Sequence, residues 1–256
     1  VNITKINNFL NDPDSKMSDI ARQISNDVTL TADLLKLVNS AAFALASPCR
    51  SVADAVKLIG IHGVKNLLLT IGSMNNLVSD DSKNKGLWDH SYKVAFYSYN
   101  LAKNFCTAPA DRHVQDDAYI CGLLHDMGKL IFETAHPDSL QRIRCVCAEK
   151  DIDSDVFEKL LAGANHGEVG SMIAHKWNFP EVIVDVIKYH HAPDLAPEQI
   201  KKLTSIVYIA DLVSHWQEHE IEYYQFDEDI LALFNLNKEE KLQQLSEKLQ
   251  ASFSAQ

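Results

Sequence analysis

The chain has 256 residues, of which 46% are apolar and 23% are charged, and its formal net charge at pH 7 is −11. This length allows one large domain or two small ones, and the composition is ordinary for a soluble protein. An acidic surface without a Lys/Arg cluster repels phosphate backbones, and no apolar run approaches the roughly 20 residues that span a bilayer, so we expect neither nucleic-acid binding nor membrane insertion.

The N-terminus and the cysteines favour a cytoplasmic location. Residues 1–8 are mixed and polar, which is unlike a secretory signal peptide. The five cysteines are scattered and form no metal-type CxxC pair, so we expect reduced thiols in the core. The first residue is Val rather than Met, which favours further protein upstream.

Helices are predicted along nearly the whole chain, because only nine glycines occur and alternating strand patterns are scarce. In the first half, capping residues and apolar spacing predict helices over about 27–39, 51–60 and 62–77. In the second half, we expect helices over about 88–104, 114–131, 166–177, 181–191 and 202–216. Residues 137–162 are expected to be helical without carrying chemistry. The predicted fold class is therefore all-α.

A polar connector at residues 80–86 is predicted to divide the chain. We place an N-terminal helical subdomain at 1–80 and a second helical subdomain, which carries the candidate site, at 86–236. Residues 237–256 are predicted to form a C-terminal surface helix that packs through one leucine stripe.

Residues of the types that commonly bind metals lie on the apolar stripes of five predicted helices. Their helical phase predicts that these side chains point inward. These positions are His90, His125, His166, His190, His191 and Asp211. Asp126 is rotated by about 100° from His125 but can reach the same cavity. A single inward His is usually a core residue that bonds to a carbonyl, so no one position would indicate a metal.

The two carboxylates strengthen the prediction of a metal site. A buried Asp needs a cation or several donors to offset its lost hydration, and neutral histidines do not meet that need. Five His and two Asp are too many ligands for one ion and about right for two, with Asp126 as the bridge. Mixed imidazole and carboxylate ligands suit iron, manganese, zinc or nickel rather than calcium. Two such ions can clamp a phosphate and activate water.

Two further residues stand near these ligands. Lys129 follows His125 by four positions and Asp126 by three, so it can share their face and neutralise an oxygen of a phosphorylated small molecule. A surface Lys near a helix end is an equally good interpretation. Lys129 and Asp126 are the candidate catalytic residues. His215 lies one turn after Asp211 and is a candidate hydrogen-bonding partner behind the ligands.

These motifs, in this order, resemble the HD superfamily of metal-dependent phosphohydrolases, and most closely the HDOD domain, the HD-related output domain of bacterial signalling proteins. The resemblance covers nearly the whole chain. It rests on residues 34–43, 51–60, 88–91, 122–129, 166–170, 177 and 190–193. The Asn39-Ser40 segment points to the HDOD family, whereas the His125-Asp126 pair alone points only to the superfamily.

The resemblance implies an all-helical bundle, a role in signal transduction and frequent attachment to regulatory domains, with no generally established enzymatic activity. The chain also matches the related HD-GYP phosphodiesterases of cyclic di-GMP at all seven candidate ligands and at Lys129. It lacks their Gly-Tyr-Pro signature, where it reads Ala192-Pro193-Asp194, and it has Gly86 where an acidic ligand is expected one turn before His90. Hydrolysis of cyclic di-GMP is therefore not expected.

Two functions from different classes remain. The favoured one is a signalling output module that acts through a regulatory protein partner, for which the apolar N-terminal subdomain could offer a docking face. Core packing explains that apolar pattern equally well. The alternative is an active metal-dependent phosphohydrolase on a phosphoester or nucleotide. A redox or gas sensor with a diiron centre is a third, weaker hypothesis.

Overall fold

The computed structural model describes residues 24–25, 28–39, 49–58, 63–64, 68, 85–108, 114–130, 154–177 and 179–254. Every regular element in these ranges is a helix, which confirms the predicted all-α class. In chain order they are α3 (Val28–Val38), α5 (Lys85–Phe105), α6 (Val114–Leu124), α9 (Ser154–Ala162), α10 (His166–Lys176), α11 (Glu181–Tyr189), the 3-10 turn η3 (Pro193–Leu195), α12 (Glu198–Gln217), η4 (Tyr223–Gln225), α13 (Glu228–Leu233) and α14 (Glu239–Ser254).

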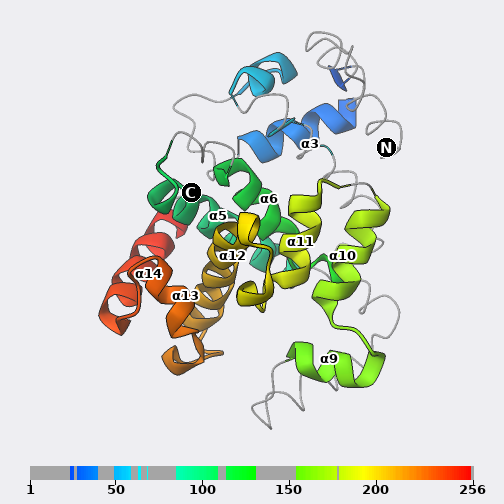
Figure 1. The fold of residues 1–256 in the computed structure, drawn as a ribbon. Coiled ribbons are helices and arrows are strands. Elements are labelled where there is room, and N and C mark those ends of the chain that lie inside the picture. The colour runs from blue at the N-terminus through cyan, green and yellow to red at the C-terminus, as the bar shows by residue number, and fades with distance from the viewer. Residues whose placement is uncertain are drawn as a thin grey trace.

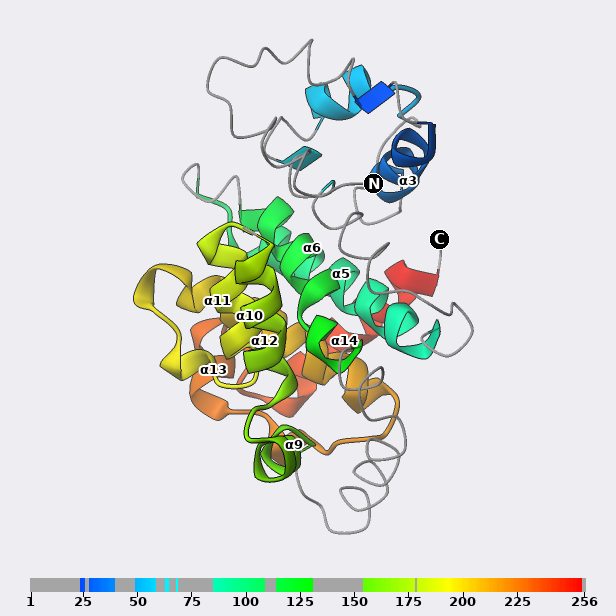
Figure 2. The same cartoon turned by 90° about the vertical axis from the view of Figure 1, so that its right-hand side faces the viewer.

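The helices of the second half form a bundle around α5, α6 and α12. These three pack against one another, α11 packs on α6 and α12, and α10 packs on α11. Figures 1 and 2 both place α3 at one end of the molecule and α9 at the other. In the described ranges, none of the helices has the length and apolar character that a membrane span requires.

The contact between α5 and α6 depends on Gly122. A Cβ at this position would lie 2.9 Å from the Val94 carbonyl oxygen and 2.9 Å from the Ala95 Cα. Because both neighbours are backbone atoms of α5, a larger residue would push the two helices apart. The close crossing brings His90 on α5 near the end of α6.

The prediction of one continuous helix over 114–131 was wrong at residues 125–126. Helix α6 ends at Leu124, His125 and Asp126 form a turn, and the helical conformation resumes over 127–130. The ring Nδ1 of His125 lies 2.8 Å from the Gly122 carbonyl oxygen, which anchors the turn to the last turn of α6. At this turn His125 Nε2 lies 3.4 Å from Asp126 Oδ2, whereas residues next to each other in a straight helix point about 100° apart.

Asn39 joins the end of α3 to the next described segment. Its side-chain Oδ1 accepts a hydrogen bond from the Cys49 backbone N–H at 2.6 Å, and its Nδ2 donates to the Cys49 carbonyl at 2.8 Å. The cap predicted at Ser51 is present, since Ser51 Oγ accepts from the Asp54 backbone N–H at 3.1 Å. It opens a helical segment over 52–58, within the predicted 51–60.

Other helix limits differ modestly from the predictions. Helix α12 begins at Glu198, directly after Pro197, rather than near 202. Helix α14 matches the predicted C-terminal helix and buries Leu242 and Leu249. Most of the predicted helix 62–77, most of the connector 80–86 and residues 137–153 lie outside the described residues. The division into 1–80, 86–236 and 237–256 therefore stays a prediction.

Candidate metal centre

The structure brings all seven predicted ligands together in one cluster. They come from α5, the turn after α6, the first residue of α10, the end of α11 and the middle of α12. Together with His215, their ligand atoms fall into three overlapping groups, and within each group these atoms lie within 4.8 Å of one another. The groups are Asp126, His166, His190 and His191; His90, His125 and Asp126; and His90, Asp211 and His215.

The Asp126 carboxylate lies between two sets of imidazoles. Its Oδ1 is 3.1 Å from His166 Nε2 and 3.9 Å from His190 Nε2. Its Oδ2 is 3.4 Å from His125 Nε2 and 3.8 Å from His90 Nε2. Each carboxylate oxygen therefore faces a different pair of rings, which is the arrangement that a carboxylate bridging two cations requires.

Three of the buried rings have their tautomer fixed by an oxygen at Nδ1. His125 Nδ1 lies 2.8 Å from the Gly122 carbonyl, and His190 Nδ1 lies 2.7 Å from the Ile187 carbonyl. His166 Nδ1 lies 2.7 Å from Glu158 Oε2. A carbonyl or carboxylate oxygen can only accept, so each Nδ1 carries the proton. In the neutral rings Nε2 then holds the lone pair and is available to a metal.

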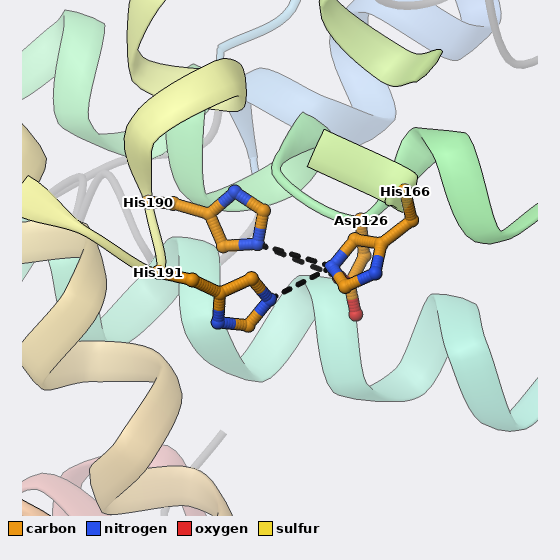
Figure 3. A group of neighbouring side chains, drawn as sticks. All are labelled: Asp126, His166, His190 and His191. Atoms are coloured by element: carbon orange, nitrogen blue, oxygen red, sulfur yellow. Dashed lines mark hydrogen bonds and ion pairs between the residues drawn. The ribbon is translucent and has the colours of Figure 1, made fainter. Parts of the chain in front are cut away.

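The contacts among these Nε2 atoms fit a bound cation. His166 Nε2 lies 3.3 Å from His190 Nε2 and 2.8 Å from His191 Nε2. Figure 3 shows the three rings with ring nitrogens turned toward one another beside Asp126. Lone pairs at these distances repel unless a proton or a cation lies between them. In addition, His125 Nε2 and Asp126 Oδ1 are buried without a hydrogen-bond partner. Divalent transition metals on both sides of Asp126 would satisfy these atoms.

The surroundings keep two of these histidines neutral. Burial, reinforced by the nearby His125 and His166, lowers the pKa of His190 to about 3. Burial and the adjacent His190 likewise hold the pKa of His191 well below its ordinary value. Both rings therefore present a free lone pair at neutral pH, as metal ligands must.

The carboxylates, by contrast, are held in their charged form. Burial raises the pKa of Asp126, but His125 and Lys129 outweigh it and bring that pKa well below its usual range. His215 has the same effect on the pKa of the buried Asp211. Burial opposes a charge on His125, yet Asp126 and Asp211 raise its pKa to about 10. Without a cation the cluster thus retains a proton on His125, whose place a bound metal would take.

The first turn of α10 presents His166 to the cluster in a fixed position. Asn165 caps this helix with a capping box, in which its side chain accepts from the Glu168 backbone N–H at 2.9 Å. Gly128 lies directly against the turn, and a Cβ there would fall 1.9 Å from the His166 carbonyl oxygen. The backbone following Asp126 and the backbone of His166 can approach this closely only because residue 128 is Gly.

Glu158 bonds to a residue of the cluster, a role that the sequence analysis did not predict. Its Oε2 accepts from both the backbone N–H and the ring Nδ1 of His166, each at 2.7 Å. Glu158 is only 2% exposed, whereas Val156 and Leu160 on the same helix α9 are 47% and 77% exposed. Residues 137–162 were expected to carry no chemistry, and the inward position of this one carboxylate on α9 corrects that expectation.

Lys129 and His90 lie toward the solvent-facing side of the cluster, with side chains 19% and 15% exposed. The Lys129 ammonium is 2.7 Å from Asp126 Oδ2, so this residue contacts the cluster and is not a detached surface Lys. Its catalytic role, like the ligand roles of the seven predicted residues, stays a prediction.

Comparisons with known proteins agree with this arrangement. The HDOD domain model matches residues 1–193. An uncharacterised protein of Treponema pallidum (strain Nichols) is 36% identical over 254 residues, which cover 99% of this chain and 49% of that protein. The chain therefore spans about half the length of this relative.

Two solved structures share the fold. A provisionally assigned phosphohydrolase from Shewanella amazonensis SB2B superposes with a TM-score of 0.71 at 24% identity, covering 97% of this chain and 88% of the other. An HDOD domain protein of unknown function from Geobacter sulfurreducens gives a TM-score of 0.72 at 23% identity, covering 99% and 88%. The HDOD domain model matches three quarters of the residues, and solved HDOD structures share the fold. The chain therefore belongs to the HDOD family.

Proposed function

We propose that this HDOD domain is a signal-transduction output module whose second half holds two divalent transition-metal ions. The observation that carries the metal proposal is the position of Asp126, whose two oxygens face separate pairs of imidazoles. A single ion would engage one pair and leave the other pair and the second oxygen without a cation. The ligand types suit iron, manganese, zinc or nickel.

The ligands divide naturally between the two ions. The first ion would be held by Asp126, His166, His190 and His191, and the second by Asp126, His90, His125 and Asp211. For the second ion, Asp211 Oδ1 lies 3.0 Å from His90 Nε2 and 3.5 Å from His125 Nε2. Asp126 would be the bridging carboxylate.

The output role would be exerted through a regulatory protein partner. Support comes from membership of the HDOD family and from the length of the Treponema pallidum relative, of which this chain matches only 49%. The centre would stabilise the arrangement of α5, α10, α11 and α12 that a partner meets, because ions that bind only the folded state shift the equilibrium toward it.

The direct test is to count metal ions per chain after anaerobic purification without chelators. Wild-type protein is expected to hold about two equivalents of iron, manganese, zinc or nickel, because the ligand set suits two ions. A His125→Ala/Asp126→Ala double variant is expected to lose both, since it removes the bridge. His175→Ala, at an exposed position of α10, is the matched control and should keep the wild-type content. Wild-type protein without metal, even after anaerobic reconstitution, would contradict the proposal.

A second candidate function, a metal-dependent phosphohydrolase, is favoured by the position of Lys129. Burial opposes its charge, but Asp126 and Asp211 raise the pKa of this ammonium, so it stays positive at the solvent-facing side. Bound divalent cations would supply an activated water and offset phosphate charge. Lys129 would bind a phosphate oxygen, and Asp126 would orient the water that attacks. The absent Gly-Tyr-Pro signature speaks against cyclic di-GMP as the substrate.

Hydrolysis of phosphomonoesters, nucleotides and cyclic dinucleotides with added Mn²⁺ or Fe²⁺ tests this function. Lys129→Met is expected to lower turnover by about 10²-fold while metal content is retained, because it removes one preorganised positive charge. Lys176→Met, at an exposed position of α10, is the control. Turnover that survives unchanged in His125→Ala and Asp126→Ala would come from a contaminant and would exclude the enzyme.

A further inference from the structure

His215 lies on α12 one turn after Asp211, at the edge of the cluster. Its Nε2 is 3.3 Å from Asp211 Oδ1, and its ring centroid is 4.7 Å from that of His90. The candidate ligand atoms of these three residues lie within 4.8 Å of one another. The ring of His215 therefore lies as close to its neighbouring ligand atoms as the predicted ligands do to theirs.

Glu220 fixes the orientation of the His215 ring. Its Oε2 lies 2.5 Å from His215 Nδ1, and because a carboxylate oxygen only accepts, Nδ1 is the donor. In the neutral ring, Nε2 is then the lone-pair nitrogen, and it points at Asp211 Oδ1, which is also an acceptor. Two acceptors 3.3 Å apart need a positive charge between them. That charge is either a proton or a cation.

The same arrangement occurs on the opposite side of the cluster at His166. There Glu158 Oε2 lies 2.7 Å from Nδ1, and Nε2 faces Asp126 Oδ1 at 3.1 Å. A carboxylate thus holds Nδ1 of each ring while Nε2 faces an Asp of the cluster. In metal sites, a carboxylate at the far nitrogen commonly fixes the tautomer and orientation of a ligating His.

The proposed second ion has fewer imidazole ligands than the first. The first group contains three histidines and one aspartate, whereas the proposed second group has only two histidines, His90 and His125. Helix α5 supplies no further ligand one turn before His90, because Gly86 stands there and a Cβ added to it would meet nothing within 4 Å. His215 would bring the second ion to three imidazoles as well.

We propose that His215 ligates the second ion through Nε2 and that Glu220 positions it. This inference rests on the two-ion centre proposed above. In the competing arrangement, His215 is a protonated ring that bridges Asp211 and Glu220 and never contacts a metal. The two arrangements predict different affinities for the second ion after the His215 ring is removed, and the same affinity for the first ion.

The experiment measures metal content and stepwise Mn²⁺ or Co²⁺ affinity in wild type, His215→Ala and Glu220→Gln. His215→Ala is expected to keep the first ion and to bind the second about 100-fold more weakly, and the visible Co²⁺ spectrum should lose one component. Glu220→Gln keeps an acceptor for Nδ1 and is expected to weaken the second ion by about 10-fold. His175→Ala is again the matched control.

Added imidazole separates a lost ligand from a disturbed fold. The His215 side chain is 27% exposed, so a free imidazole can enter the space left in His215→Ala and should restore the second ion. It should not do so in His125→Ala, because that side chain is fully buried. Two ions held by His215→Ala with wild-type affinity would overturn the role of His215. Wild-type protein with fewer than two ions would instead contradict the two-ion centre itself.

Discussion

Gly128→Ala is expected to destabilise the protein by more than about 4 kcal/mol or to prevent folding, a loss in the range of the most damaging core substitutions. The added Cβ would lie 1.9 Å from the His166 carbonyl oxygen, 2.7 Å from its carbonyl carbon and 2.9 Å from the Gly170 nitrogen. All three atoms belong to the backbone of α10, so no side-chain rotation relieves the overlap. Helix α10 would have to move away and would take His166 out of the cluster.

Urea unfolding and metal content measured on the same samples check this expectation. Gly86→Ala is the matched control, because a Cβ at Gly86 meets nothing within 4 Å and the residue lies in α5. That change is expected to be neutral or to stabilise by up to about 1 kcal/mol, since Ala favours a helix over Gly. A Gly128→Ala protein with the wild-type unfolding midpoint and full metal content would contradict the close packing of this turn against α10.

Glu158→Ala is expected to cost about 2–5 kcal/mol, because it leaves two buried donors of His166 without an acceptor. It should also weaken metal binding by about 10–100-fold, since the ring loses the group that keeps Nδ1 protonated and Nε2 directed into the cluster. The first ion should be affected more than the second, because His166 belongs to the first group. Chemical unfolding of the metal-free protein and stepwise metal titration measure the two effects separately.

Two variants distinguish the causes of this loss. Glu158→Gln retains an acceptor oxygen without the charge, so an intermediate loss of stability is expected. Glu181→Ala removes a Glu from an exposed position of α11 and should leave stability within about 0.5 kcal/mol of wild type. Equal behaviour of Glu158→Ala and Glu181→Ala would show that the inward hydrogen bonds contribute nothing.

Much of the bundle and the set of clustered residues could be predicted from periodicity. His90 and Asp211 lie 121 positions apart, yet each stands on the apolar stripe of its own helix, and their side chains meet at 3.0 Å. Phase within a helix is a local property, so the sequence reveals which side chains turn inward. Residues that have ligand chemistry and stand on an inward face can therefore be recognised from the sequence alone.

The features that sequence reasoning missed depend on contacts between distant segments. The break at His125 and Asp126 is accompanied by the approach of Gly128 to α10, which no local pattern encodes. Glu158 is only 2% exposed and bonds to His166, eight residues away on another helix, a contact that the pattern of its own helix does not predict. Asn39 shows the reverse case, because a segment noted only for its resemblance proves to hold Cys49 by two hydrogen bonds.

The wide spacing of the clustered residues along the chain also has a kinetic consequence. A contact between residues 121 positions apart closes a very long loop. The chain loses the entropy of that loop before the contact stabilises it, so we expect such contacts to form late in folding. Ions bound there would stabilise the native state more than the folding transition state. They would therefore slow unfolding and leave the folding rate little changed. The unfolding rate of the bundle would then depend on the metal concentration, and its folding rate would depend on it much less.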